Sequence, residues 1–291
     1  MRLITFAHAG QDRLGALASH GGAERVYDLN QLEPRLPADM VAFLAGGPEA
    51  LTLARDAVAA AGANQGLDPA AVQIKAPLPR PGKIICIGQN YLAHAQESNA
   101  GAPPYPIIFA KFANSVIGPG ETIVVPPAIT QPDYEGELAV VIGRQGRNIP
   151  EANALDYVAG YMPLHDVSAR DWQMRTSQWV IGKTPDTFCP MGPAIVTADE
   201  IPDVQNLALR TIIGGEVLQE GHTSLMIFSV AHLIADMSQV MTLEPGDIIA
   251  TGTPAGIGAA RTPPRWLRTG DVVRIEIEGI GVLENPVVVE A

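Results

Sequence analysis

One stretch of the chain combines the residues of a buried strand with closely spaced carboxylates: Asp133-Tyr134-Glu135-Gly136-Glu137-Leu138-Ala139-Val140-Val141-Ile142-Gly143. The β-branched apolar run in its second half predicts a buried strand. Side chains alternate along a strand, so Glu135 and Glu137 are expected on one side, where repulsion and desolvation disfavour two bare charges. A divalent cation such as Mg²⁺ or Mn²⁺ would neutralise them, because hard ions bind carboxylate oxygens. The stretch therefore predicts an open metal site.

The composition limits the class of partner. The chain has 291 residues, 47% of them hydrophobic, which is enough for one large domain or a large and a small one. Its 19 Lys and Arg against 31 Asp and Glu give a net charge of −12. That charge argues against nucleic acid or an anionic membrane, because no basic surface is available to bind them. A small-molecule ligand is expected instead.

The cysteines and the apolar runs bear on the compartment. Cys86 and Cys189 lie in apolar surroundings without metal-type spacing, which favours a reducing environment over a disulfide framework. The apolar run after Met1 is too short for a secretory signal, and no later run approaches membrane-spanning length. A soluble, cytoplasmic protein is expected.

A proline-rich segment at 76–82 reads as a linker, because it sustains neither a helix nor a central strand. It predicts a small N-terminal domain over 1–75, with short strands and an alanine-rich helix at about 48–61, and a catalytic domain over 76–291. In the second part a helix is expected at about 225–239, capped by Ser224. Strand-like runs there cover 83–88, 122–125, 138–143, 207–213, 247–250 and 272–277. Strands and helices do not alternate strictly, so the fold class is predicted as α+β, mainly β.

Two further groups of side chains could take part in chemistry. His94 and Glu97 are three residues apart, so one helical turn would bring imidazole and carboxylate together as a general base, or as an ordinary surface ion pair. Asp166 closes a strand-like stretch and could supply a third carboxylate; alternatively it caps a helix, and His165 is a core histidine.

Three sequence signatures of other enzyme classes are not met. Ile181-Gly182-Lys183-Thr184 resembles the end of a phosphate-binding loop, but Ser177 stands where that loop requires glycine. Gly252-Thr253-Pro254-Ala255-Gly256-Ile257-Gly258 fails the dinucleotide pattern at Pro254. It remains a turn, or a tight loop whose amides and Thr253 hydroxyl bind a substrate carboxylate. No Gly-x-Ser-x-Gly elbow is present, which disfavours a serine hydrolase.

Taken in order, the motifs from Pro79 to Val289 resemble the fumarylacetoacetate hydrolase family. The motifs that carry the resemblance are 85–91 with His94 and Glu97, Phe109-Ala110-Lys111, 133–138, Asp166-Val167-Ser168-Ala169-Arg170-Asp171, Gly182-Lys183, Leu243-Glu244-Pro245-Gly246-Asp247 and Thr251-Gly252-Thr253-Pro254. The resemblance implies a catalytic domain of the fumarylacetoacetase type, a mixed β-sandwich roll that is usually dimeric. The small N-terminal domain is then the α/β domain that longer members carry.

The same resemblance implies a role for each site residue. Glu135, Glu137 and Asp166 correspond to metal ligands, the metal being Mg²⁺ and sometimes Mn²⁺ or Ca²⁺. His94 and Glu97 correspond to a water-activating dyad on a lid at about 91–106. The remaining matches are Lys183 and Gln173 at the reacting oxygens, Thr253 at the substrate carboxylate, Arg170 holding the Asp166 loop or contacting substrate, and Tyr91 contacting substrate.

The implied activity is hydrolysis of a carbon–carbon bond in a 2,4-dioxo acid of the acylpyruvate type, giving pyruvate or a related 2-oxo acid and a carboxylic acid. Metal-stabilised enolate chemistry also serves an oxaloacetate decarboxylase or tautomerase, or a sugar-acid hydrolase or dehydratase. A non-catalytic metal-binding protein is a third hypothesis. Two residues depart from the family pattern: His165 where Asn is usual, and Gln89 where Arg is common.

Overall fold

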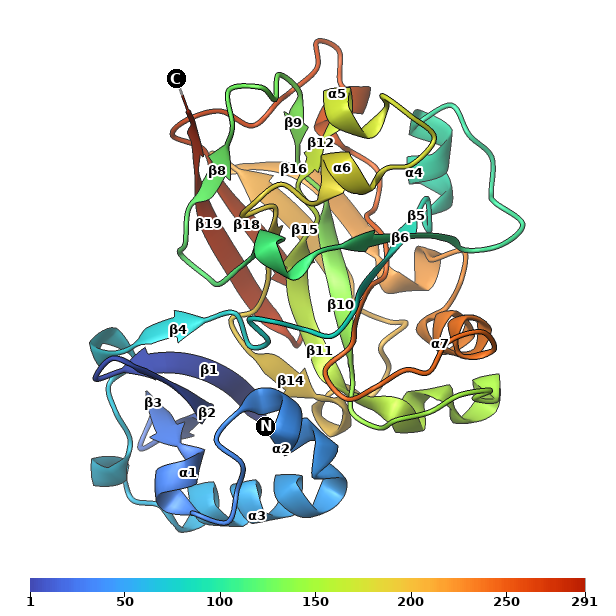
Figure 1. Ribbon diagram of the computed structural model, residues 1–291. Helices are drawn as coiled ribbons and strands as arrows, with labels where there is room; N and C mark the ends of the chain where they lie inside the picture. Colours follow the sequence, from blue (N-terminus) through green and yellow to red (C-terminus); the bar gives the residue numbers. More distant parts are fainter. Residues whose placement is uncertain (291) are drawn as a thin grey trace.

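The computed structural model describes residues 1–290, whose backbone is organised around two sheets (Figure 1). The larger sheet has ten strands and runs through the whole length of the molecule. Its order is β3 (Ala23–Asp28), β2 (Gln11–His20), β1 (Arg2–His8), β14 (Ile195–Thr197), β11 (Val158–His165), β10 (Gly136–Ile142), β17 (Ile248–Ala250), β5 (Ile84–Gly88) and β6 (Ile107–Lys111), with β4 (Gln73–Lys75) paired to β1.

The second sheet packs against the middle of the first, and the main hydrophobic core lies between them. Its order is β16 (Glu216–His222), β15 (Ala208–Ile213), β18 (Val272–Ile277), β19 (Gly281–Val289) and β8 (Ile123–Val125). Two short pairs complete the strands, β12 (Ser168–Ala169) with β9 (Pro132–Asp133) and β13 (Cys189–Pro190) with β7 (Val116–Ile117). This architecture confirms the predicted α+β, mainly β class.

The helices are short, apart from one in the N-terminal part. They are α1 (Leu29–Leu32), α2 (Met40–Ala45), α3 (Gly47–Ala60), α4 (Leu92–Glu97), α5 (Arg170–Gln173), α6 (Val180–Lys183) and α7 (Val230–Ser238). The alanine-rich helix expected near 48–61 is α3. Within residues 1–290, no helix combines the length and the apolar character needed to cross a bilayer.

The helix expected from about 225 begins later than predicted. Residues Thr223–Leu225 form a separate 3₁₀ turn, and α7 starts after Ser229, whose side chain accepts a hydrogen bond from the backbone N–H of His232. Ser224 instead lies beside His222, with its Oγ 2.7 Å from the ring Nδ1. Both serines precede apolar residues, so the sequence alone did not show which one caps the helix.

The N-terminal part shares its sheet with the rest of the chain. The strands expected before residue 30 form the hairpins β1–β2–β3, and the free side of β1 pairs with β14 through Leu3 and Ile195. Figure 1 shows this part, coloured blue, packed at the end of the large sheet through β1 and β14. The boundary expected between residues 75 and 76 stays a prediction.

The buried strand β10 positions the carboxylates identified in the sequence. It pairs with β11 on one side and β17 on the other, so Gly136 lies opposite His165 and Ala139 opposite Ala250. Gly136 faces the second sheet closely enough that a β-carbon would overlap Thr211, which explains the glycine between the two glutamates. Because β17 and β5 run parallel, the loops that follow them meet at one edge.

Prediction on the α7 cap: replacing Ser229 by Ala is expected to lower the free energy of unfolding by about 1 kcal/mol, because the substitution removes the N-cap acceptor. Ser224→Ala is the matched control, and it should leave stability within about 0.5 kcal/mol of the parent. Urea unfolding followed by circular dichroism measures both values. Equal losses in the two variants would contradict the assigned helix start.

Candidate active site

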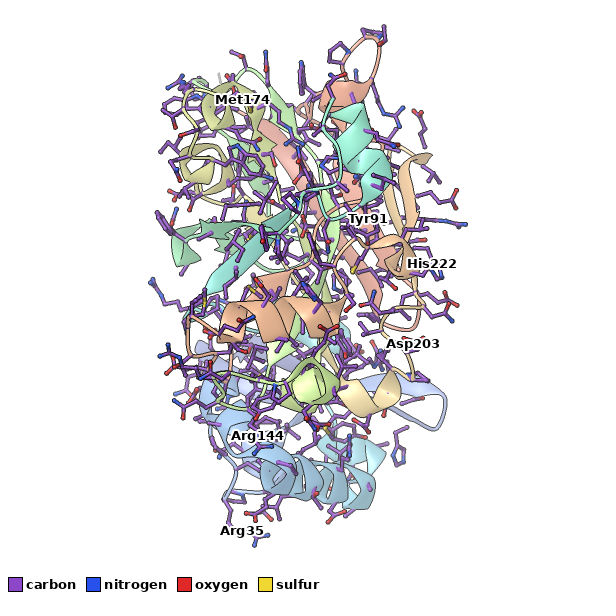
Figure 2. The ribbon with its side chains drawn as sticks, turned by 90° about the vertical axis from the view of Figure 1, so that its right-hand side faces the viewer. Arg35, Tyr91, Arg144, Met174, Asp203 and His222 are labelled. Carbon is purple, nitrogen blue, oxygen red and sulfur yellow. The ribbon has the colours of Figure 1, made fainter. Side chains whose placement is uncertain are left out.

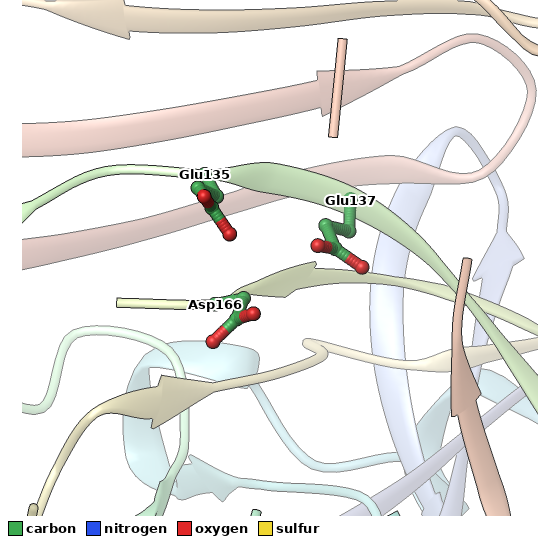
Figure 3. Close-up of side chains that lie close together, drawn as sticks. All are labelled: Glu135, Glu137 and Asp166. Carbon is green, nitrogen blue, oxygen red and sulfur yellow. The ribbon is translucent and has the colours of Figure 1, made fainter. Parts of the chain in front are cut away.

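Three carboxylates form a compact cluster at the start of β10 and the end of β11 (Figure 3). One oxygen from each of Glu135, Glu137 and Asp166 lies within 4.8 Å of the others, and all three side chains are buried. Glu137 belongs to β10, whereas Glu135 is the residue directly before the first residue of β10. The backbone N–H of Asp166 donates to the Glu135 carbonyl at 2.9 Å, which continues the strand pairing beyond β11. The predicted grouping of these carboxylates is therefore present.

Two of the three carboxylates are neutralised by cationic side chains. Arg170 Nη2 donates to Glu135 Oε1 at 2.5 Å, and Lys183 Nζ donates to Glu135 Oε2 at 2.6 Å. Asp166 accepts from Lys111 Nζ at 2.6 Å and from Lys183 Nζ at 2.7 Å. Burial favours a raised pKa for Glu135, but Arg170 and Lys183 outweigh it and hold the pKa well below its usual value.

Glu137 is the carboxylate without a cationic partner. Its Oε2 accepts a hydrogen bond from the backbone N–H of Gly252 at 2.8 Å, and no Lys or Arg of residues 1–290 forms an ion pair with it. Burial, together with the charges of Asp166 and Glu135, raises its pKa well above the usual value. The cluster thus contains one carboxyl group, that of Glu137, which no cationic side chain of residues 1–290 neutralises.

The chemistry of this donor set fits a hard divalent cation. Carboxylate oxygens are the ligands that Mg²⁺, Mn²⁺ and Ca²⁺ prefer, and a cation between them would remove the charge imbalance at Glu137. Glu135, Glu137 and Asp166 could therefore hold a metal ion.

Lys111 is a member of the cluster to which the sequence analysis gave no role. Its ammonium is buried and also donates to the Val167 carbonyl at 3.1 Å. A signal was present, because Lys111 ends the apolar strand run Ile107-Ile108-Phe109-Ala110. A lysine buried at the end of such a strand requires a carboxylate partner, since an unpaired buried charge is strongly disfavoured.

Arg170, on α5, ties the cluster to the neighbouring loops. Its Nε donates to Asp133 Oδ2 at 2.9 Å and its Nη1 donates to Gln173 Oε1 at 3.0 Å, in addition to the bond to Glu135. Asp133 also accepts from the backbone N–H of Gly258 at 2.7 Å. Asp133 and Glu135 raise the pKa of Arg170 despite its burial, so the guanidinium stays charged. All three of its nitrogens are engaged within the protein.

His94 and Glu97 lie on α4 and contact each other as the spacing predicted. His94 Nδ1 is 2.8 Å from Glu97 Oε1, and Glu97 Oε2 accepts from the backbone N–H of Gly256 at 2.8 Å. An ionised carboxylate accepts only, so Nδ1 carries the ring proton in the neutral imidazole. The Nε2 lone pair of His94 is then free to act as a base.

A cavity of about 430 Å³ brings most of the predicted site residues together. Those that line it are His94, Glu135, Glu137, Arg170, Gln173, Lys183 and Thr253. Asp166 and Glu97 do not line the cavity, but each contacts a residue that does. Asp166 accepts a hydrogen bond from Lys183, and Glu97 contacts His94 and accepts from the backbone N–H of Gly256. A larger cavity, of about 1030 Å³, lies beside α3 and contains none of the predicted site residues.

Two predicted substrate contacts do not offer a free donor at the cavity wall. The Thr253 hydroxyl donates to the Gly136 carbonyl at 2.9 Å and accepts from Gln219 Nε2 at 2.8 Å, so its proton is already used. Tyr91 lies at the base of α4 (Figure 2), outside the cavity wall, with a buried hydroxyl that has no partner among residues 1–290. The roles expected for both residues stay predictions.

The two departures from the family pattern occupy different places. His165 is buried, lies outside the cavity wall, and neither ring nitrogen has a hydrogen-bond partner within residues 1–290. Burial, followed by the positive charge of Lys111, lowers its pKa to about 3, so the ring is neutral near pH 7. Gln89, in contrast, lines the cavity.

The chain combines two packed mixed sheets with a carboxylate cluster that could hold a metal ion, and sequence comparison assigns its class. Residues 83–288 match the family described as Fumarylacetoacetate (FAA) hydrolase C-terminal, and the chain belongs to this family. The rat mitochondrial protein named oxaloacetate tautomerase Fahd2a is 48% identical over 99% of this chain and 92% of its own length.

Two proteins with solved structures of similar fold are named for different reactions. The 5-carboxymethyl-2-hydroxymuconate delta-isomerase from Mycobacterium smegmatis is 35% identical with a TM-score of 0.79, and the match covers 100% of both chains. The maleylpyruvate hydrolase from Sphingobium, solved with manganese(II) and pyruvate, is 31% identical with a TM-score of 0.82 over 100% of both chains. Isomerases and hydrolases therefore share this fold, and enzymatic activity on a small molecule is the common property.

The cytoplasmic location expected from the sequence is contradicted by the relatives, because the rat protein and its human counterpart are named as mitochondrial. The expectation rested on the cysteines and on the absence of a secretory signal. Cys86 and Cys189 are indeed buried and free. Free thiols indicate a reducing environment, but they do not distinguish one reducing compartment from another.

Prediction on metal binding: Glu137→Gln is expected to abolish stabilisation by Mg²⁺ or Mn²⁺, because it removes the carboxylate whose charge the cation would offset. At an ion concentration one hundred times the Kd, the parent protein should gain about 2.7 kcal/mol. Glu49→Gln, at an exposed site on α3, is the control and should keep that gain. Thermal unfolding with and without the ion measures the difference; a gain retained in Glu137→Gln would exclude this site.

Prediction on pH: the metal-free protein is expected to lose stability as pH rises above the usual carboxyl pKa of 4.5. Because folding raises the pKa of Glu137, the folded state binds more protons than the unfolded chain in this range, and deprotonation favours unfolding. Glu137→Gln should flatten this slope, and the metal-free variant should be more stable than the parent at pH 8. Urea unfolding in chelator at several pH values tests it; identical slopes would contradict the shift.

Proposed function

We propose that this chain catalyses the keto–enol tautomerisation of a small 2-oxo diacid, with oxaloacetate as the first substrate to test. In this reaction the proton on the enol oxygen at C2 leaves and a proton is added at C3, so the composition of the molecule is unchanged. The observation that carries the proposal is the 48% identity to an oxaloacetate tautomerase over 99% of the chain.

The cavity supports the proposal through the donors that remain free. The Lys183 ammonium has three N–H groups, of which two donate to Glu135 and Asp166, so one is left for a substrate oxygen. Burial lowers the pKa of Lys183, but Asp166 and Glu135 outweigh it and raise the pKa, so the ammonium stays charged. It can offset negative charge that develops on the C2 oxygen.

Arg170 orients Gln173 so that Gln173 can also donate to a substrate oxygen. Its Oε1 accepts from Arg170, which leaves the Nε2 amide hydrogens to donate into the cavity that Gln173 lines. Mg²⁺ is the ion that we propose for Glu135, Glu137 and Asp166; when bound, it would supply the positive charge that stabilises an enolate. These groups select the 2-oxo acid end of a substrate.

His94 is the proposed carrier of the proton at C3. His94 lines the cavity, and its Nε2 lone pair can take a proton from C3 of the keto form or, as the imidazolium, return that proton to C3 of the enol form. Glu97 accepts from Nδ1 and stabilises the imidazolium between the two transfers. Because Gly256 holds Glu97 in turn, the dyad is oriented before substrate arrives. The same arrangement supports a second candidate, in which His94 activates water to hydrolyse a 2,4-dioxo acid.

Prediction on activity: the parent protein with Mg²⁺ is expected to convert enol-oxaloacetate to its keto form faster than the spontaneous reaction, measured by the loss of enol absorbance. His94→Asn should reduce kcat by about 100-fold or more, since a positioned acid–base group contributes that much. His232→Asn removes a histidine that pairs with Glu151 on the surface and should leave the rate unchanged.

Product analysis separates the alternatives in the same experiment. A tautomerase releases no pyruvate from oxaloacetate beyond the spontaneous amount, a decarboxylase does, and a hydrolase releases pyruvate from an acylpyruvate. Faster turnover of the acylpyruvate than of oxaloacetate would replace the proposed function by the hydrolase. No turnover of either substrate by a protein that binds Mg²⁺ would favour a binding protein.

We also propose that the protein is a homodimer that associates through β6, the edge strand of the large sheet. This strand is at the edge of the large sheet. Ile108 on β6 is 44% exposed, and Phe112, the residue after β6, is 55% exposed. An uncovered apolar edge strand favours pairing with another chain, and a second copy can add to it about a two-fold axis.

Prediction on assembly: Ile108→Lys is expected to shift the mass in solution from twice 30.7 kDa toward a single 30.7 kDa chain. A lysine on an edge strand disfavours pairing because its charge would have to be desolvated. Val217→Lys is the matched control, since Val217 is 46% exposed on β16 at the edge of the other sheet. Sedimentation equilibrium measures the masses; a dimer in both variants would place the interface elsewhere.

A further inference from the structure

The turn after β5 holds one residue in an unusual backbone conformation at the cavity. Gln89 has a φ of +55°, in the left-handed region that residues other than glycine seldom adopt. Its neighbour Asn90 fixes the turn: Asn90 Nδ2 donates to the carbonyls of Thr251 at 2.8 Å and Phe228 at 3.1 Å, and Asn90 Oδ1 accepts from the Phe228 N–H at 2.8 Å. The conformation of Gln89 is thus imposed by the structure around it, which is typical of functional positions.

Gln89 lines the cavity, and its side-chain amide has no hydrogen-bond partner within residues 1–290. It is partly buried and lines the same wall as His94. Among residues 1–290, no group forms a hydrogen bond with its side-chain amide, whereas the amides of Asn90 and Gln173 are both bonded. The preceding Gly88 is covered by the Trp179 ring, against which a β-carbon at Gly88 would collide. The Gln89 amide is therefore available to a ligand.

The cations of this cavity are already paired. Arg170 and Lys183 are the cationic residues that line it within the described chain, and both contact carboxylates of the protein. A second acid group on the substrate, beyond the end held at the carboxylate cluster, must consequently meet neutral donors. A primary amide donates to a carboxylate through either of its two N–H groups.

We propose that Gln89 is a specificity-determining residue that donates a hydrogen bond to the distal carboxylate of a four-carbon 2-oxo diacid. This inference rests on the proposed function and deepens it, since it names the group that distinguishes a diacid from a simple 2-oxo acid. The 2-oxo acid end lies at Lys183 and the carboxylate cluster, and the distal end lies toward the turn at Gln89.

Two ligands that differ only at the distal group test the proposal. Oxaloacetate and 2-oxobutyrate both have four carbons, and a methyl group in the second replaces the distal carboxylate of the first. Their dissociation constants can be measured with Mg²⁺ present by titrating the intrinsic fluorescence of Trp179 and Trp266, which line the cavity. The parent protein is expected to bind oxaloacetate at least about tenfold more tightly, the effect of one hydrogen bond to a charged group.

Gln89→Ala should remove this preference and leave the affinity for 2-oxobutyrate unchanged. Gln89→Glu keeps the shape of the side chain but places a negative charge at the distal site, so it should bind oxaloacetate more weakly than the Ala variant. Unchanged binding of 2-oxobutyrate by Gln89→Glu would show that the rest of the site is intact. Gln96→Ala is the matched control, because Gln96 is exposed on α4 and lies outside the cavity wall.

A preference for oxaloacetate that persists in Gln89→Ala, or a parent protein without that preference, would overturn the proposal. Failure of the proposed function gives a different result. A parent protein that binds oxaloacetate through Gln89 but does not interconvert its keto and enol forms retains the diacid site and loses the tautomerase assignment.

Discussion

The arrangement of the site depends on the neutralisation of carboxylates that are buried at the start of one strand. Four acidic groups meet three cations within the sheet edge and its loops: Asp133, Glu135, Glu137 and Asp166 against Lys111, Arg170 and Lys183. Each cation comes from a different element, β6, α5 or α6, so the charges can balance only when these distant segments have reached the start of β10. One carboxyl group, that of Glu137, remains without a cationic partner among residues 1–290, and the cluster could therefore hold a metal ion.

These ion pairs organise the site more than they stabilise the fold. Buried pairs return little net free energy, because desolvation of the charges offsets their attraction. The stability comes from the apolar layer between the two sheets, which contains the alternate side chains of β10, Leu138, Val140 and Ile142. Glu135 and Glu137 are thus held at the end of a rigid strand whose packing does not depend on them. Such a strand can position an uncompensated charge without unfolding around it.

Strong local patterns made part of this predictable. The run 138–142 and the alanine-rich helix α3 are predictable because their apolar spacing is regular, and the carboxylates stand out because they directly precede a buried strand run. The strand-like stretch that Asp166 closes is β11, but its start could not be predicted, since Gly160 and Pro163 break its apolar pattern, and tertiary pairing with β10 overrides that weak propensity. The start of α7 and the partner of Lys111 were not predictable for a related reason. Each is decided by a contact in space that the local pattern does not specify: Ser229 rather than Ser224 caps α7, and Asp166 accepts from Lys111.

The pairing of β1 with β14 has a consequence for how the chain is made. During synthesis Leu3 appears long before its partner Ile195, so the start of β1, which β4 does not cover, presents an unpaired edge while the intervening residues are added. At about 5–20 residues per second this interval lasts roughly 10–40 seconds. The N-terminal hairpins must therefore remain unaggregated as a nascent segment with one open side. A chaperone that covers an exposed strand edge at the ribosome would be most needed in that interval.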